Sequence, residues 1–150
     1  MIKILLVHGP NLNLLGARSP EIYGTVSLEE INARMETVAE ENGAELHAFQ
    51  SNSEGALIDA IHEAVNWADG IVINPGAYAH YSYAIRDALA SVKIPSIEVH
   101  LSNIYARDEF RRHSVVSPVV AGCISGLGWR SYAYGIQAMI ALLQDRAACK

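Results

Sequence analysis

Residues 2–11 read IKILLVHGPN, an apolar run that stops at His8 and passes into a glycine-proline turn. A short apolar run bounded by turn residues is typical of a buried β-strand. Four further runs of this kind follow along the chain, and helical patterns separate them. The five predicted strands are Ile2–Val7, Glu45–Gln50, Gly70–Ile73, Ile94–Val99 and Pro118–Ile124.

Helical periodicity fills the intervals between the later runs. The predicted helices are Leu28–Glu41, Glu54–Ala68, about Tyr81–Val92 and about Ser131–Arg146. The first begins with a capping box, Ser27 with Glu30 three residues on, and ends before Gly43. The second is capped by Ser53 and has Leu57, Ile58, Ile61 and Val65 on one face. Strands that alternate with helices predict an α/β fold, here a flavodoxin-like, doubly wound five-stranded parallel sheet with helices on both faces.

Length and composition indicate a single domain over residues 1–150 with a sizeable hydrophobic core, because about half of the residues (51%) are hydrophobic. No linker, repeat or low-complexity tract is visible. The formal net charge of -5 leaves no basic stripe, so nucleic acid and anionic membranes are not expected as partners. No apolar stretch is long enough to span a membrane. Cys123 and Cys149 match neither a disulfide framework nor a metal-binding spacing, which favours a reduced, cytoplasmic setting.

Polar residues gather where the predicted strands end. In doubly wound sheets, ligands bind outside the carboxyl ends of the strands. The opposite edge carries little besides Lys3, Glu45 and Lys93. We therefore predict a polar small-molecule site at the carboxyl edge, formed from residues that follow the strands: His8, Asn11, Ser51, Asn52, Asn74, Glu98, His100, Ser125 and Gly126.

Glu98 and His100 lie two apart on the fourth predicted strand, so their side chains point to the same face. A carboxylate there can orient an imidazole and raise its proton affinity, which suits a general acid. A buried histidine satisfied by its neighbour would show the same spacing, and both interpretations stay open on spacing alone.

Three other segments offer polar groups near this edge. Residues 74–83, NPGAYAHYSY, turn out of the third strand and place His80 near a helix start, where backbone N–H groups favour anionic or hydroxyl-rich ligands. Arg107, Arg111 and Arg112 follow the fourth strand, and one of them could pair with a substrate carboxylate, whereas at least one is expected to be a solvated charge. Residues 16–24, GARSPEIYG, form a long connection without periodicity, which is either disordered or functional.

Cofactor and metal chemistry have weaker support. Residues 126–131, GLGWRS, imitate a dinucleotide fingerprint, but the third glycine is a serine and too little chain follows for the acidic ribose partner. We predict no nicotinamide cofactor. Metal ligation by His8, His80, His100 and Glu98 is a minor alternative, because these residues form no recognised close-spaced motif.

Four segments together carry a resemblance to a known family. They are residues 9–24 (GPNLNLLGARSPEIYG), 74–89 (NPGAYAHYSYAIRDAL), 98–114 (EVHLSNIYARDEFRRHS) and the glycine turn before the last helix. In this order they resemble the type II 3-dehydroquinate dehydratases over essentially the whole chain. The resemblance implies a flavodoxin-like fold, a dodecamer built from trimers and no cofactor. It also implies trans loss of water from 3-dehydroquinate to give 3-dehydroshikimate in the shikimate pathway.

The resemblance also implies roles for particular residues. Tyr23 matches the family's catalytic base, Arg18 the arginine beside it, and Asn11 the asparagine that holds a water against the developing enolate. His100, oriented by Glu98, matches the acid that protonates the departing hydroxyl. Positions that match substrate-binding groups are Asn74, His80, Leu101, Ser102 and Arg111, with the backbone of Ile104 and Ser102 near the carboxylate. Asp87 matches a residue contributed by a neighbouring subunit.

The resemblance implies that the connection over residues 16–24 is an active-site lid that carries the base. Departures from the family pattern concern the dynamics of this lid and substrate affinity more than the reaction. They are Ser19 in place of an acidic residue, Ala79 and Tyr81 in place of threonines, and Ser131 in place of a glycine.

The chemistry needs an ionised phenol, and a tyrosine with an ordinary pKa of about 10 is ionised only to roughly one part in a thousand at neutral pH. A guanidinium close to it favours the phenolate. A lysine Schiff base is disfavoured, since Lys3, Lys93 and Lys150 lie away from the predicted site. Two other classes stay as alternatives: a flavodoxin-like binding module without catalysis, and a metal-dependent hydrolase.

Overall fold

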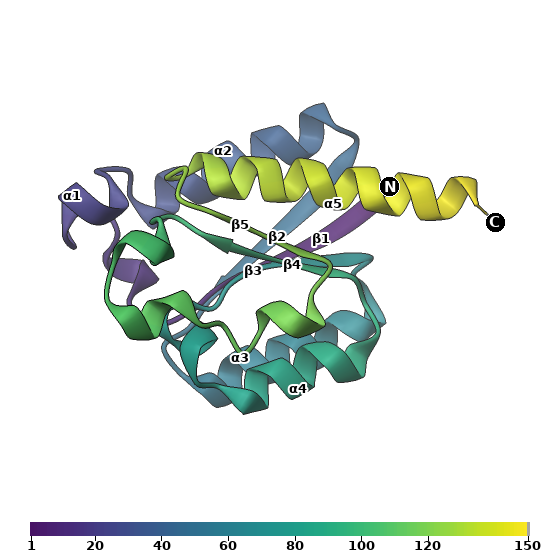
Figure 1. The fold of residues 1–150 in the computed structure, drawn as a ribbon. Coiled ribbons are helices and arrows are strands. Elements are labelled where there is room, and N and C mark those ends of the chain that lie inside the picture. The colour runs from purple at the N-terminus through teal and green to yellow at the C-terminus, as the bar shows by residue number, and fades with distance from the viewer. Residues whose placement is uncertain (150) are drawn as a thin grey trace.

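A computed structural model describes residues 1–149 of the chain. Five parallel strands form one sheet in the order β2-β1-β3-β4-β5 (Figure 1). This order is the flavodoxin-like one, so the predicted fold class is confirmed. The strands are β1 (Ile2–His8), β2 (Ala44–Gln50), β3 (Gly70–Asn74), β4 (Ser96–His100) and β5 (Gly122–Ser125).

Helices cover both faces of the sheet, as predicted. Helices α2 (Leu28–Glu41) and α5 (Arg130–Ala148) lie on one face, and α3 (Glu54–Glu63) and α4 (Tyr83–Val92) on the other (Figure 1). Alternate residues of β1 divide between the two hydrophobic cores, with Ile4 and Leu6 beneath α2 and α5. Leu5 and Val7 pack on the α3 and α4 side. The central strands are buried on both faces, which accounts for their unbroken apolar runs.

Helix starts follow the predicted capping residues. The Ser27 hydroxyl accepts the Glu30 N–H at the start of α2, and the Ser53 hydroxyl accepts the Ala56 N–H at the start of α3. Each bond satisfies a backbone donor that has no partner within its helix. Helix α2 ends before Gly43, whose φ of 76° is left-handed.

Two predicted helix boundaries were wrong. The segment predicted as Glu54–Ala68 leaves α-helical geometry after Glu63 and continues as the 3-10 turn η2 (Ala64–Asn66). Val65, predicted on the apolar face, is 56% exposed in this turn. Helix α4 begins at Tyr83 rather than about Tyr81, because Ser82 caps it through the Ile85 N–H.

Prolines account for the strand boundaries that were wrong. Strand β4 begins at Ser96, after Pro95, instead of Ile94, and it extends to His100. Strand β5 begins only at Gly122, because Pro118 lies in the 3-10 turn η6 (Ser117–Val119). Proline has no N–H to donate to a sheet ladder, so it is found at strand starts or in turns.

The loops after the strands contain short ordered elements that build the carboxyl edge of the sheet. Residues 16–24 include a four-residue helix, α1 (Pro20–Tyr23), so this segment has secondary structure of its own. The other turns at this edge are η1 (Leu12–Leu14), η3 (Gly76–His80), η4 (Ile104–Ala106) and η5 (Glu109–Arg112).

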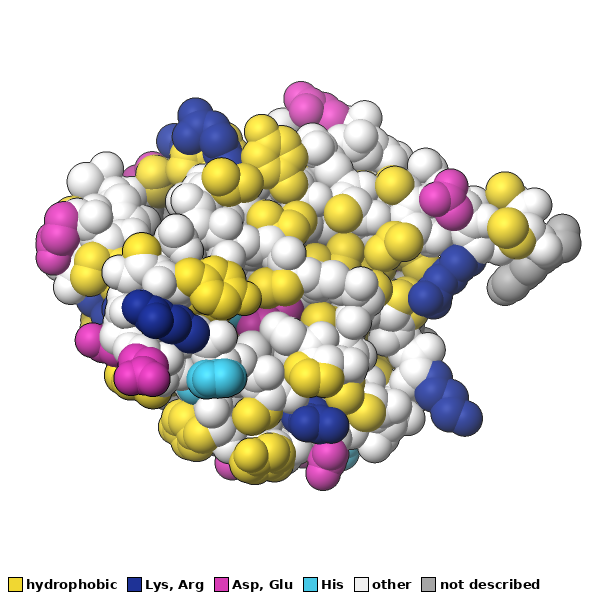
Figure 2. Space-filling view, viewed as in Figure 1, with side chains coloured by type: hydrophobic (Ala, Val, Ile, Leu, Met, Phe, Trp, Pro, Cys, Tyr) yellow, Lys and Arg dark blue, Asp and Glu magenta, His cyan; other side chains and the backbone are white. Residues whose placement is uncertain are grey.

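Surface charge is mixed, and on the face in Figure 2 basic and acidic side chains are interspersed among hydrophobic ones. Within residues 1–149, none of the helices combines the length and the apolar character that crossing a bilayer requires.

Candidate active site

A cleft opens at the carboxyl ends of β1, β3 and β4, at the point where the strand order reverses. Such switch points are where doubly wound sheets bind ligands. All the residues to which the family resemblance gives a role line this cleft except Glu98, which lies behind it, and Asp87. Of the other residues predicted at the carboxyl edge, His8, Ser51, Asn52, Ser125 and Gly126 do not line it. The predicted residues that line it are Asn11, Arg18, Tyr23, Asn74, His80, His100, Leu101, Ser102 and Arg111, together with Ile104.

Two guanidinium groups lie against the ring of Tyr23. It ends α1, and the Cζ atom of Arg18 lies 4.5 Å from the centre of its ring. Arg107, from the loop after η4, approaches the same ring at 5.0 Å. Its Nη1 also donates to the Ser102 hydroxyl at 3.2 Å, which fixes the guanidinium in place. The phenol therefore has positive charge from two separate segments of the chain.

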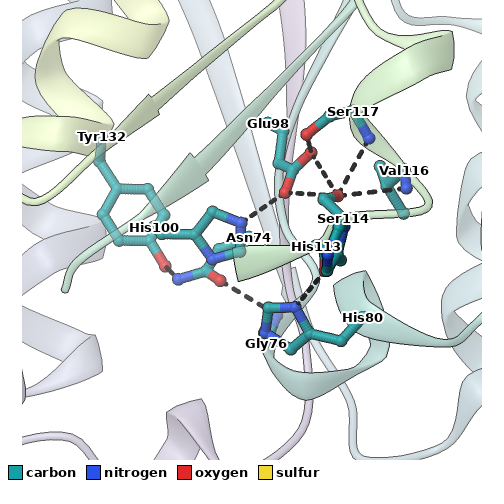
Figure 3. Close-up of polar contacts among 10 residues, drawn as sticks. All are labelled: Asn74, Gly76, His80, Glu98, His100, His113, Ser114, Val116, Ser117 and Tyr132. Atoms are coloured by element: carbon teal, nitrogen blue, oxygen red, sulfur yellow. Dashed lines mark hydrogen bonds and ion pairs between the residues drawn. The ribbon is translucent and has the colours of Figure 1, made fainter. Parts of the chain in front are cut away.

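His100 is held by a buried carboxylate. Its Nε2 lies 2.5 Å from Oε2 of Glu98, whose side chain is fully buried (Figure 3). Glu98 also accepts hydrogen bonds from the hydroxyls of Ser117, at 2.6 Å, and Ser114, at 3.0 Å. The Ser114 hydroxyl in turn accepts the Val116 N–H.

The protonation states of this pair follow from the contacts. Burial alone would raise the pKa of Glu98, but the hydrogen bond and the charge of His100, together with the hydrogen bonds from Ser117 and Ser114, outweigh it and hold the pKa below its usual value. Glu98 is therefore an ionised carboxylate, which can only accept hydrogen bonds. The proton between the two groups must lie on Nε2 of His100, and Nδ1 is the nitrogen left for a ligand.

His80 stacks on His100 across the cleft, with ring centroids 6.3 Å apart and an interplanar angle of 18°. Its Nδ1 donates to the backbone carbonyl of His113 at 2.7 Å (Figure 3). Burial lowers the pKa of His80, and the charges of His100 and Arg111 lower it further against the opposing effect of the His113 carbonyl. A neutral imidazole with Nδ1–H engaged presents Nε2 as an acceptor for a ligand hydroxyl.

Asn74 is fixed from beneath by a buried chain of hydrogen bonds. Its carboxamide oxygen accepts the Gly76 N–H at 3.1 Å, and its Nδ2 donates to the hydroxyl of Tyr132 at 3.0 Å (Figure 3). That hydroxyl lies 2.9 Å from Nδ1 of His8, whose Nε2 lies 2.8 Å from Oδ1 of Asn32. Because the Asn32 oxygen only accepts, Nε2 of His8 donates to it, and Nδ1 accepts the Tyr132 hydroxyl.

His8 was predicted among the groups of the carboxyl edge, and as one of the metal ligands in the alternative interpretation. That placement was wrong, because the side chain turns into the core and is fully buried. Burial lowers the pKa of His8 to about 4, against a smaller opposing effect of its hydrogen bond to Asn32, so it is neutral at physiological pH. Burial raises the pKa of Tyr132 far above its usual value. Both groups support the cleft from beneath.

Asn11 has a left-handed backbone with a φ of 68°, which asparagine tolerates better than most residues. Its N–H donates to Oδ1 of Asn52 at 2.9 Å, and its carbonyl accepts the Leu14 N–H. Both backbone groups are therefore occupied by the loop, and the carboxamide of Asn11 lines the cleft.

Asp87 lies on the exposed side of α4, outside the cleft of its own chain. Among the lysines, Lys3 is at the amino-terminal end of β1 and Lys93 follows α4, and neither lines the cleft. Lys150 lies outside the described residues.

Four contributors to the site were missed or left undecided from the sequence. Arg107 was one of three candidate arginines, and only the structure places it against Tyr23. Ser114 stands at the end of the segment 98–114, whereas Ser117 and Tyr132 have no local signal. Ser117 acts through Glu98, 19 positions earlier in the chain, and Tyr132 acts through Asn74, 58 positions earlier.

The residues that depart from the family pattern lie outside the proposed reacting groups. The Ser131 hydroxyl accepts the Leu127 N–H at 3.1 Å, within a turn where Gly126 and Gly128 are left-handed. Ala79 is buried, and Tyr81 points outward with 59% exposure. Ser19 has a left-handed backbone at the start of α1.

The fold is that of a doubly wound α/β protein, and its cleft holds groups able to take and give protons: a tyrosine with two arginines against its ring, and a histidine held by a carboxylate. The chain belongs to the class II dehydroquinase family. The family model described as "Dehydroquinase class II" matches residues 2–140. The family resemblance inferred from the sequence is thereby confirmed.

Individual relatives are similar over nearly their whole length. A 3-dehydroquinate dehydratase of Pelotomaculum thermopropionicum is 55% identical over 141 residues, which cover 94% of this chain and 98% of the relative. One from Acaryochloris marina is 56% identical over 144 residues, covering 96% and 97% of the two chains. The crystal structure of a type II dehydroquinase from Butyrivibrio crossotus superposes with a TM-score of 0.90 at 51% identity, covering 92% and 97%.

Proposed function

We propose that this protein is a type II 3-dehydroquinate dehydratase of the shikimate pathway, which removes water from 3-dehydroquinate in a trans elimination to give 3-dehydroshikimate. The observation that carries the proposal is the convergence of Tyr23, flanked by two arginines, and His100, held by Glu98, on one cleft of a class II dehydroquinase fold. The reaction needs one group to take a proton and another to give one.

Tyr23 is the base. Its phenolate removes the proton from the carbon next to the ketone, and the electron pair moves onto the carbonyl oxygen to form an enolate. Arg18 and Arg107 place positive charge against the ring of this tyrosine. The enolate charge must be stabilised where it develops, and the carboxamide of Asn11 holds a water for that purpose.

His100 is the acid. As the enolate collapses to the conjugated enone, His100 gives a proton to the departing hydroxyl, which leaves as water. Glu98 accepts a hydrogen bond from Nε2 of His100 and fixes the orientation of the ring. Ser114 and Ser117 keep the carboxylate from turning away.

The remaining polar groups bind the substrate. Asn74, His80 and Arg111 supply hydrogen bonds to its hydroxyls, and the backbone at Ser102 and Ile104, with Leu101 beside them, forms the carboxylate pocket.

Three further properties belong to this proposal. Residues 1–150 form a single catalytic unit that acts in the cytoplasm as a homododecamer, a tetramer of trimers, and Asp87 reaches the cleft of a neighbouring subunit from its exposed position on α4. Both proton-transfer groups come from the chain itself, so no cofactor is invoked. Static light scattering tests the assembly, and a fully active monomer would contradict it.

Incubation with 3-dehydroquinate, followed by the ultraviolet absorbance of the conjugated enone, tests the reaction. We expect Tyr23→Phe and His100→Ala each to lower kcat by about 10²- to 10⁴-fold, the range that general acid–base groups contribute, with the fold unchanged. Tyr134→Phe is the matched control, because this exposed tyrosine of α5 lies outside the cleft. Equal turnover in Tyr23→Phe and the control would contradict the assignment of the base.

The alternatives give different results in the same assay. A binding module without catalysis would produce no absorbance change. A metal-dependent enzyme would lose activity with a chelator, whereas we expect full activity to persist. Inactivation by borohydride in the presence of substrate would indicate a lysine Schiff base, and we expect none.

A further inference from the structure

Cys123 joins Glu98 and His100 through the pairing of the last two strands. Cys123 on β5 is the register partner of Glu98 on β4, and His100 pairs with Ser125. Partner residues on adjacent strands point to the same face, as do residues two apart on one strand. The thiol therefore stands beside the carboxylate that holds the proposed catalytic acid.

The three side chains are close enough to share one ion. A ring nitrogen of His100, a carboxylate oxygen of Glu98 and Sγ of Cys123 all lie within 4.8 Å of one another. Zinc is bound at about 2.0–2.3 Å by the same three kinds of ligand, usually in tetrahedral geometry. The hydroxyls of Ser114 and Ser117 hold the Glu98 carboxylate beside the other two groups.

Charge and access also suit a divalent cation. A thiolate, a carboxylate and a neutral imidazole balance a charge of two, once the thiol proton has passed to solvent and the ring proton of His100 has moved from Nε2 to Nδ1. Glu98 and His100 are buried, but Cys123 is exposed, so an ion has an approach from the β5 side. Three protein ligands leave one position for water, as in open zinc sites.

We propose that Glu98, His100 and Cys123 form an inhibitory site for soft or borderline divalent cations such as Zn²⁺ and Cd²⁺. The ion occupies the nitrogen and the carboxylate that keep His100 in position as a proton donor, so turnover stops while the ion is bound. The loss of turnover rests on the proposed role of His100, whereas the binding of the ion does not.

Binding is measured first, without substrate, on the whole reduced protein in metal-free buffer. Titration with CdCl₂ should produce the ultraviolet charge-transfer band of a cadmium thiolate, saturating at one ion per chain, and calorimetry with ZnCl₂ should give the same stoichiometry. Cys123→Ser should abolish the band and weaken Zn²⁺ binding by more than about 100-fold, because even outer partners of metal ligands account for about 10- to 100-fold. Cys123→Ala should behave in the same way.

Cys149→Ser is the matched control, since Cys149 is the other exposed free cysteine. It should keep the band and the affinity of the unmodified protein. The proposal is overturned if the unmodified protein gives no band, or if the band survives in Cys123→Ser and disappears in Cys149→Ser.

Activity is measured second, at ZnCl₂ concentrations that saturate the site. We expect Cys123→Ser to retain the metal-free turnover of the unmodified protein and to resist zinc at concentrations about 100-fold higher. Full turnover of the zinc-saturated protein would overturn the inhibitory role. If no dehydratase activity is found at all, the proposed function fails, while the spectroscopic result still decides the metal site.

Discussion

Lowering the pH from 6.5 to 4 tests the buried chain of hydrogen bonds beneath the cleft. His8 is the titratable group in that chain, and burial lowers its pKa from the ordinary 6.5 to about 4. The folded protein therefore resists protonation of His8 over this range, whereas the unfolded chain takes up a proton. Stability must fall as the pH falls, because the unfolded state binds more protons.

The size of the effect follows from the two pKa values. A pKa lowered from 6.5 to about 4 corresponds to about 3 kcal/mol of unfolding free energy, present above pH 6.5 and lost progressively towards pH 4. Glu98 adds a further loss of unfolding free energy at lower pH, because its pKa in the folded protein is also lowered. Its contribution to stability disappears as the pH falls through this lowered pKa.

Urea denaturation at a series of pH values, at one protein concentration, measures this loss. His8→Gln is the comparison variant, because its carboxamide can donate to Asn32 and accept from Tyr132 without titrating. We expect the unfolding free energy of the unmodified protein to fall by about 3 kcal/mol relative to His8→Gln between pH 6.5 and pH 4. The Glu98 contribution is common to both proteins and cancels. Parallel stability curves would refute the reasoning.

Three substitutions test other contacts. Tyr132→Phe removes a hydroxyl that makes two buried hydrogen bonds, so it should lower the unfolding free energy measured in urea by about 1–3 kcal/mol and raise KM. Unchanged stability would argue against the buried chain of hydrogen bonds. Glu98→Gln should lower kcat about 10- to 100-fold, because hydrogen bonds to charged groups are worth about 1.5–3 kcal/mol. It should also alter the pH dependence of the reaction rate, and an unaltered dependence would contradict the role of Glu98. Gly135→Ala places a Cβ 2.7 Å from Cγ1 of the stiff Val99 side chain. The overpacking costs about 1–3 kcal/mol and should exceed the gain in helix propensity of about 1 kcal/mol, so the protein should be destabilised. A raised melting temperature would contradict this expectation.

Local patterns in the sequence predicted the elements and their order. The cap at Ser27 and the left-handed Gly43 are properties of a few adjacent residues, and both are confirmed. Boundaries were wrong where an unfavourable residue lay within an otherwise apolar run, as at Pro118. Periodicity averages over such residues, whereas the backbone responds to each one.

The site was predictable in its parts but not in its connections. The spacing of Glu98 and His100 indicated their shared face, and the structure confirms their contact. The placement of Arg107 on the Tyr23 ring depends on how two loops fold over the sheet. The inward turn of His8 depends on Tyr132, which lies 124 residues further along the chain. No local rule relates such pairs.

The strand order also determines when the cleft is completed as the chain is synthesised. After β2, each new strand is added at the same growing edge, so the segments that carry Tyr23 and His100, the proposed base and acid, are synthesised before α5. The tyrosine that anchors Asn74 arrives last, on α5. A nascent chain that ends before residue 130 therefore contains both proposed proton-transfer groups but lacks the Tyr132 hydroxyl that holds Asn74.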